Sequence, residues 1–139
     1  MRILTDFIEL PSKGGSDIVD LTGRIQECLG KSGFSEGQAL VFAPGATAGI
    51  TTMEYEPGLK KDIPEALDRI APSDADYHHD DTWHDGNGHS HVRASLLGPS
   101  LNVPFKDGQL LLGTWQQIVL IDCDNRPRTR RIVVQLTGE

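Results

Sequence analysis

All five histidines of the 139-residue chain lie in one segment, residues 77–91, which reads YHHDDTWHDGNGHSH. Imidazole and carboxylate groups together are ligands that zinc and similar divalent metals take in proteins. The segment therefore predicts a metal site. Its spacing is not diagnostic, because neither an HExxH motif nor a pair of closely spaced cysteines accompanies it. A solvent-exposed histidine-rich loop is the alternative interpretation.

The local chain geometry distinguishes some of the histidines. His78 and His79 are adjacent, so in an extended chain they face opposite sides and only one of them is expected in a site. His89 and His91 lie on either side of Ser90. If Ser90 caps a helix, these two rings need not point in the same direction.

Other polar positions could complete the site. Asp85 opens the turn sequence Asp-Gly-Asn-Gly, where it can ligate a metal or form an Asx turn. Glu54 stands at the end of an expected strand. Three roles stay open for it: a general base, a partner of a metal ligand, or a surface residue without a role in the site. Residues 44–49, PGATAG, form either a small-residue loop that a ligand approaches closely or an ordinary tight connection. Gln116, beside Trp115, needs a hydrogen-bond partner if it is buried.

The apolar spacing predicts the elements that must position these residues. Helices are expected at residues 21–31 and 59–70, where apolar side chains recur on one face, and a short helix capped by Ser90 is expected to run to Leu97. Residues 77–91 lack periodicity and are expected to form a loop. Strands are expected at residues 2–10, 17–19, 38–43, 50–55, 101–105, 109–112, 114–123 and 130–137. This order favours an α+β fold with a largely antiparallel sheet or sandwich.

Composition limits the classes of partner. The net charge of −7 argues against nucleic acid, and the one arginine cluster, residues 126–131, is expected to lie on a solvated strand face rather than to form a phosphate patch. No apolar run reaches signal-peptide or membrane-spanning length, so we expect a soluble, cytoplasmic, single-domain protein without a membrane partner. Cys28 and Cys123 are expected to be buried thiols, and a disulfide between them is the alternative.

Several motifs resemble the signature of the YjbQ-type family, whose members are labelled secondary thiamine-phosphate synthase. They are SLLGPS at residues 95–100, VP at 103–104, DG at 107–108 and LGTWQQI at 112–118. The similarity extends through residues 44–54, His79, His91 and the C-terminal LTGE. It implies one YjbQ-like domain over residues 1–139, namely a largely antiparallel β-sandwich with two main helices and one short helix. It also implies a homotrimer.

The resemblance also implies roles for individual residues. His79 and His91 are the expected metal ligands, for zinc or magnesium. Glu54 and Asp85 are the candidate catalytic groups. The candidate substrate-binding residues are Thr47, Asn87, Arg93 and Gln116. The chain departs from the family at residues 44–48: many members read Pro-His-Thr-Thr-Ala where this sequence has Pro-Gly-Ala-Thr-Ala, so Gly45 lacks an imidazole.

The activity implied by the resemblance is formation of thiamine phosphate. A hydroxymethylpyrimidine diphosphate loses pyrophosphate as the nitrogen of a thiazole phosphate attacks its methylene carbon. That reaction needs cations to neutralise the diphosphate, and those expected nearby are few: Arg93, Lys60 and Lys61. Two alternatives stay open: a trimeric protein that binds a metal or small ligand without turnover, and a metal-dependent hydrolase of a small substrate with Glu54 or Asp85 as base. The sequence leaves open whether the chain is an enzyme.

Overall fold

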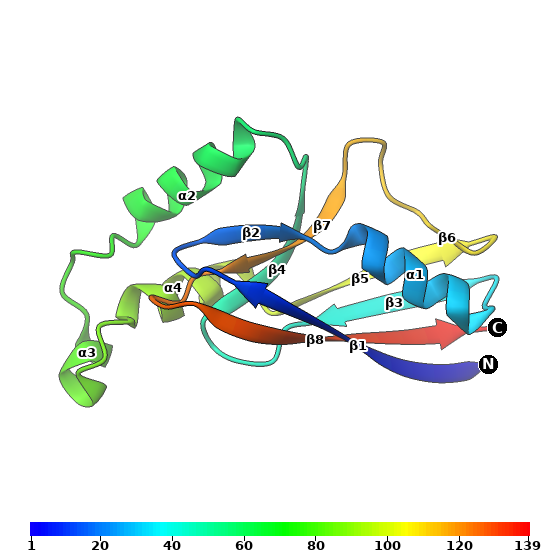
Figure 1. The fold of residues 1–139 in the computed structure, drawn as a ribbon, viewed down its shortest axis with the longest axis horizontal. Coiled ribbons are helices and arrows are strands. Elements are labelled where there is room, and N and C mark those ends of the chain that lie inside the picture. The colour runs from blue at the N-terminus through cyan, green and yellow to red at the C-terminus, as the bar shows by residue number, and fades with distance from the viewer.

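The computed structural model describes residues 1–139 and contains two antiparallel β-sheets and four helices (Figure 1). The five-stranded sheet has, in spatial order, β1 (Arg2–Ser12), β8 (Arg128–Gly138), β3 (Gly37–Phe42), β5 (Ser100–Lys106) and β6 (Gln109–Leu110). The three-stranded sheet has the order β2 (Asp17–Asp20), β7 (Gln117–Asp122) and β4 (Ala48–Met53). The predicted α+β class is confirmed.

The main core lies between the two sheets and is closed by α1 (Thr22–Ser32). Alternate residues of β8, from Ile132 to Leu136, point into this core, as the two-residue period of a strand requires. Helix α1 contributes Ile25 and Leu29, which are fully buried. Burying a side chain of this size stabilises the fold by about 1.5–3 kcal/mol, so α1 is an integral part of the sandwich.

Helix α2 (Leu59–Ile70) covers the other face of the three-stranded sheet. Leu67 and Ile63 of the helix belong to a second apolar cluster with Val119 and Ile121 of β7. Strand β7 is therefore covered on both faces, which explains its uninterrupted apolar run. None of the helices is both long and apolar enough to span a bilayer.

The histidine-rich segment is not one continuous loop as predicted. It folds into α3 (His78–Trp83), a turn and the start of α4 (Gly88–Leu97). The first turn of α3 carries Asp80 and Asp81, and carboxylates are favourable near the positive end of a helix. Helix α4 begins before Ser90, so the predicted cap is wrong: Ser90 is fully buried inside the helix.

Several strand boundaries also differ from the predictions: β4 spans Ala48–Met53 and not residues 50–55, and β6 ends at Leu110 and not at residue 112. Strand β1 continues through Pro11, which faces Thr129 across the ladder; proline is tolerated because β1 is an edge strand. Strand β7 begins at Gln117 and not at residue 114. The reason is a turn in which Gln116 Oε1 accepts a hydrogen bond of 3.0 Å from the Gly113 amide.

Candidate metal centre and neighbouring pockets

Helices α3 and α4 bring His79 and His91 into direct contact, with ring centroids 4.2 Å apart. Gly88 permits this approach, because a Cβ atom there would lie 2.4 Å from the Tyr77 Cβ atom. The Gly88 amide also donates a 2.9 Å hydrogen bond to Asp80 Oδ1. The pair of histidines predicted as ligands is thus held together by the packing between two helices.

Asp85 and Asn87 complete a polar cluster around His79. The distance from His79 Nε2 to Asp85 Oδ1 is 3.6 Å. The Asn87 amide satisfies both neighbours when its nitrogen faces them, donating to His79 Nε2 at 2.9 Å and to Asp85 Oδ1 at 2.8 Å. In this arrangement His79 Nε2 is an acceptor. That lone pair is the one an imidazole offers to a metal, so metal binding through Nε2 requires Asn87 to give up this hydrogen bond.

The donor types fit a divalent transition metal. Two ligands of a tetrahedral site with bonds near 2.1 Å lie about 3.4 Å apart, which is close to the His79–Asp85 separation of 3.6 Å. However, no three His, Cys, Asp or Glu side chains surround one common point. A complete set of protein ligands would therefore require His91 to turn toward the His79–Asp85 pair.

The small-residue loop lies beside His91. Gly45, Ala46 and Ala48 line a pocket of about 200 Å³ together with His91 and Ser95. This loop therefore lies next to one histidine, His91. Because its lining side chains are small, this pocket leaves the backbone accessible beside one imidazole.

A buried ion-pair network anchors this loop from below. Arg130 donates to Asp122 Oδ2 from Nε at 2.6 Å and to Asp122 Oδ1 from Nη2 at 2.8 Å. Its Nη2 also donates to Thr47 Oγ1 at 2.8 Å, and Thr47 donates to Asp124 Oδ2 at 3.1 Å. Thr47, a predicted substrate-binding residue, is buried. Both of these hydrogen bonds of its hydroxyl are internal.

The network also reaches the metal candidates through the turn after β7. The Asn125 side-chain amide donates a 3.0 Å hydrogen bond to the backbone carbonyl of Asp85. The backbone amide of Asn125 donates a 2.7 Å hydrogen bond to Oδ1 of the preceding residue, Asp124. The turn that carries Asp85 is thereby tied to the sandwich.

Burial and ion pairing act in opposite directions on the two aspartates. Burial tends to raise the pKa of Asp122, but hydrogen bonds from Arg130 and from the Asp124 amide outweigh it, so the pKa lies below the usual value. The pKa of Asp124 is also lowered: burial tends to raise it, but hydrogen bonds from Arg128, the Asn125 backbone amide and Thr47 together outweigh burial. Both carboxylates are consequently charged near neutral pH.

Arg93 and Glu54, two other predicted site residues, lie outside the cluster. The Arg93 guanidinium is buried and donates to the Ala71 carbonyl at 2.9 Å, Ser16 Oγ at 3.0 Å and Asp68 Oδ1 at 3.1 Å. Its contacts thus hold helices and turns together. Glu54 is exposed beyond the end of β4. Six extended residues separate it from Ala48, a distance of about 20 Å, so Glu54 does not join His91 within this chain.

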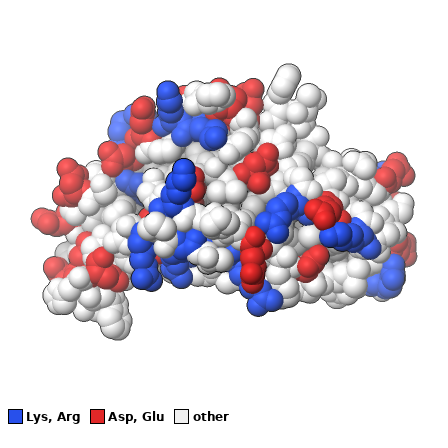
Figure 2. Space-filling view, in the orientation of Figure 1, with Lys and Arg blue, Asp and Glu red and all other residues white.

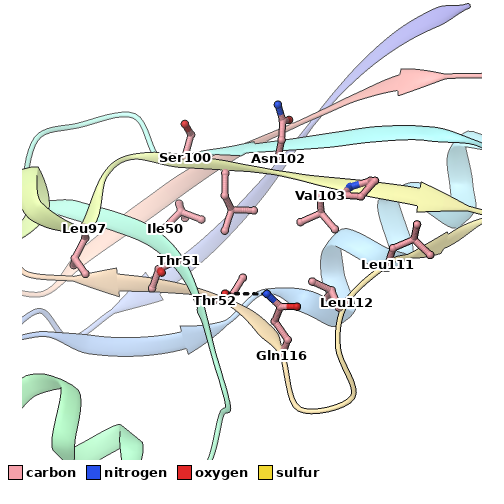
Figure 3. A pocket seen from close by; sticks show the side chains of 12 residues that line it. Ile50, Thr51, Thr52, Leu97, Ser100, Asn102, Val103, Leu111, Leu112 and Gln116 are labelled. Atoms are coloured by element: carbon pink, nitrogen blue, oxygen red, sulfur yellow. Dashed lines mark hydrogen bonds between the residues drawn. The ribbon is translucent and has the colours of Figure 1, made fainter.

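Gln116 belongs to a different pocket, of about 380 Å³, between β4 and β5 (Figure 3). Its Nε2 donates a 3.1 Å hydrogen bond to Thr52 Oγ1, the dashed line in Figure 3. Leu97, Leu111 and Leu112 contribute much of the apolar lining. No charged residue and none of the histidines lines this pocket, so the structure separates Gln116 from the candidate metal centre.

Sequence reasoning missed His89 as a buried group. Only 7% of His89 is exposed, and its Nδ1 atom has no hydrogen-bond partner. Burial, and secondarily the charge of Arg93, lowers the pKa of His89 and favours its neutral form. The sequence did contain a signal for this burial. His89 lies two residues before His91, and on a helix the side chains of such a pair point in different directions, so only one of them can face the candidate site.

The two cysteines are free thiols. Cys123 is buried and Cys28 is half-buried. Burial raises the pKa of each to about 11, so both are protonated at neutral pH and neither is suited to act as a nucleophile.

Comparison with known proteins identifies the family. The family model described as "UPF0047 protein YjbQ-like" matches residues 6–139. This chain belongs to the YjbQ family. A UPF0047 protein from Methanothermobacter thermautotrophicus is 37% identical over 100% of this chain and 95% of its own length. The YugU protein of Bacillus subtilis is 33% identical over 94% of this chain and 97% of its own length.

Solved structures of YjbQ proteins share the fold. A YbjQ-like protein of unknown function from Sulfolobus solfataricus has a TM-score of 0.89 and 30% identity, covering 99% of this chain and 100% of its own. A YjbQ/UPF0047 protein from Clostridium acetobutylicum has a TM-score of 0.87 and 35% identity, covering 95% and 99%. These relatives bear out the sandwich, and their descriptions name no activity.

Proposed function

We propose that His79, His91 and Asp85 hold one divalent transition metal ion, and that the protein is a metal-dependent hydrolase of a small molecule. The observation that carries the proposal is the convergence of His79, Asp85 and Asn87 within 3.6 Å, with the His91 ring alongside. Two histidines and one carboxylate form a ligand set that leaves a coordination position open. A metal bound there would supply a Lewis acid and activate water at neutral pH.

The remaining groups of the cluster have distinct tasks in this proposal. Asn87 holds the Asp85 carboxylate in place through its amide, and its hydrogen bond to His79 Nε2 gives way to the metal. The small side chains of Gly45 and Ala46 leave room for a substrate beside His91. Asp85 is almost half exposed, so its second oxygen can accept a proton from a substrate or water.

Thiamine-phosphate formation is the second candidate, carried by the family resemblance. That reaction uses a diphosphate leaving group, which is normally bound by Mg²⁺ with oxygen ligands. Here the donor set is rich in nitrogen, and Arg93 is engaged in internal hydrogen bonds. The geometry therefore favours hydrolysis over this transfer. The third reading, a binding protein without turnover, would use the same three ligands and differ only in the absence of product.

The metal proposal predicts that His79→Ala or His91→Ala removes the metal and leaves the fold intact. Purified protein is loaded with zinc, dialysed, and its metal content is measured by plasma mass spectrometry together with its melting temperature. We expect about one zinc per chain in the unchanged protein and an affinity loss of more than about 100-fold in either variant, because loss of a direct ligand exceeds the 10–100-fold cost of losing a supporting group.

His78→Ala is the matched control, because His78 is exposed and lies in the first turn of α3 outside the cluster. Equal metal content in all four proteins would contradict the proposed ligand set. The metal-loaded protein is then assayed for hydrolysis of phosphate and acyl esters and for thiamine phosphate from competent substrates. Ester hydrolysis that disappears in His91→Ala supports the hydrolase. Thiamine phosphate alone supports the transferase, and no product with bound metal supports the binding protein.

A further inference from the structure

A hollow of about 310 Å³ at the start of β8 is lined by three arginines and no carboxylate. Its polar lining is Arg128, Thr129, Arg130 and Arg131, next to Phe7 and Pro44. Figure 2 shows Lys and Arg atoms gathered near the beginning of β8. In a chain with 13 basic and 20 acidic residues, this concentration of guanidinium groups stands apart from the overall charge.

Two of the three guanidinium groups are held in place from below. Arg130 is 4% exposed and is fixed by Asp122, which is fully buried. Arg128 donates from Nη1 to Asp124 Oδ2 at 2.9 Å, while 39% of its own side chain stays exposed. Each arginine has five N–H donors in a rigid fork, and these ion pairs use only some of them. Donors therefore remain for a ligand.

Arg131 is the exposed arginine of the hollow. Its guanidinium carbon lies 3.8 Å from the centroid of the Phe7 ring, an arrangement that orients the planar group without using its hydrogens. Its one ionic neighbour, Glu9, lies 4.0 Å from Nε, and both side chains are more than 60% exposed. Such an exposed ion pair is weak, so an anion of higher charge can displace it.

Gly45 leaves part of Arg130 uncovered. The Nη1 atom of Arg130 makes no hydrogen bond, whereas Nε and Nη2 do. A Cβ atom at residue 45 would lie 3.2 Å from this Nη1 atom, and the φ angle of +116° is one that favours glycine. The departure from the family's histidine at this position thus coincides with a guanidinium nitrogen that makes no hydrogen bond within the chain.

We propose that this hollow binds the phosphoryl group of a small phosphate ester. Planar guanidinium forks match the paired oxygens of phosphate, and three arginines line this hollow together with Thr129. Because two buried aspartates offset two of the three charges, binding depends on directed hydrogen bonds and on the doubly charged state of the ligand. The site does not depend on the metal, and Pro44 and Gly45 place it beside the His91 pocket.

The test is calorimetric titration of the full chain with inorganic phosphate and with glycerol phosphate, in EDTA at constant ionic strength. We expect saturable binding of both, at least tenfold tighter than that of acetate. Arg131→Gln should weaken it at least fivefold. Arg131 is 61% exposed, so the variant is expected to fold, and its melting temperature verifies this.

Arg126→Gln is the matched control, because it removes one positive charge five residues away and does not line the hollow. Binding within twofold of the unchanged protein in this control supports a defined site. An equal loss in both variants, acetate binding as tight as phosphate, or no saturable heat overturns the proposal. Since EDTA removes metal, these outcomes are independent of the proposed hydrolase.

Discussion

At the scale of single residues, the pair formed by Asp122 and Arg130 holds together segments that are distant in the sequence. Both side chains are almost fully buried, and the hydrogen bond from Arg130 to Thr47 attaches the small-residue loop to β8. A buried ion pair gains stability only when its hydrogen bonds are complete, because both charges have lost their hydration. Removing one partner leaves the other charge uncompensated.

Asp122→Asn is therefore expected to lower the free energy of unfolding at pH 7 by about 3–5 kcal/mol, measured by urea denaturation. Because the folded pKa of Asp122 is below its usual value, its ionic stabilisation is present above about pH 4. It is lost as the pH falls through the folded pKa. The variant should lack this part of the acid sensitivity between pH 5 and 2.

Asp74→Asn, at an exposed position, serves as the control and should change the stability by less than about 0.5 kcal/mol. If Asp122→Asn is equally mild, the ion pair does not hold the loop as the geometry indicates.

At the scale of elements, the candidate metal centre depends on how closely α3 and α4 approach each other. Gly88 is the first residue of α4 and packs directly against Tyr77. A Cβ atom added at Gly88 would lie 2.4 Å from the Tyr77 Cβ atom. Both atoms are close to the backbone, so the contact can be relieved only by moving the helix. Such a movement would separate His91 from His79.

Gly88→Ala is accordingly expected to destabilise the protein by about 1–3 kcal/mol and to weaken zinc binding at least tenfold. Gly23→Ala in α1 is the opposite case, because no atom lies within 4 Å of its Cβ position, and alanine there should stabilise the protein by about 0.5–1 kcal/mol. Thermal unfolding and zinc titration of the two variants test this contrast. Unchanged zinc affinity in a folded Gly88→Ala protein would show that the approach of the two helices does not control the site.

At the scale of the whole molecule, several large apolar side chains remain on the surface. Trp115 is 71% exposed in the turn before β7, and Leu96 is 62% exposed on α4. Exposed apolar side chains that gather in a patch commonly mark an interaction surface. The homotrimer implied by the family resemblance is a proposal that would give these residues a partner.

Sedimentation equilibrium is expected to give about three times the chain mass of 15.2 kDa. Trp115→Ser should weaken association at least tenfold, because truncating a large aromatic anchor at an interface costs about 2 kcal/mol or more. Ile70→Ser, at a residue that is 65% exposed at the end of α2, is the control and should leave the mass unchanged. A monomer at every concentration would contradict the trimer.

The sequence alone determined the α+β class, most strands and the two long helices, because these depend on local apolar periodicity. It also singled out His79 and His91, through residue type and resemblance. The tertiary structure decided which polar residues meet. It placed Asn87 between His79 and Asp85, put Gln116 and Glu54 elsewhere, and used Arg93 in internal contacts.

It also showed that Arg128, Arg130 and Arg131, which were expected on a solvated strand face, line one hollow, and that Arg130 is buried. The physical reason is that contacts between Arg130 and Asp122, or between Phe7 and Arg131, join residues from different strands. The periodicity of a single strand indicates which face a side chain occupies. Which other side chains it meets there is decided by the pairing of the strands and the packing of the two sheets.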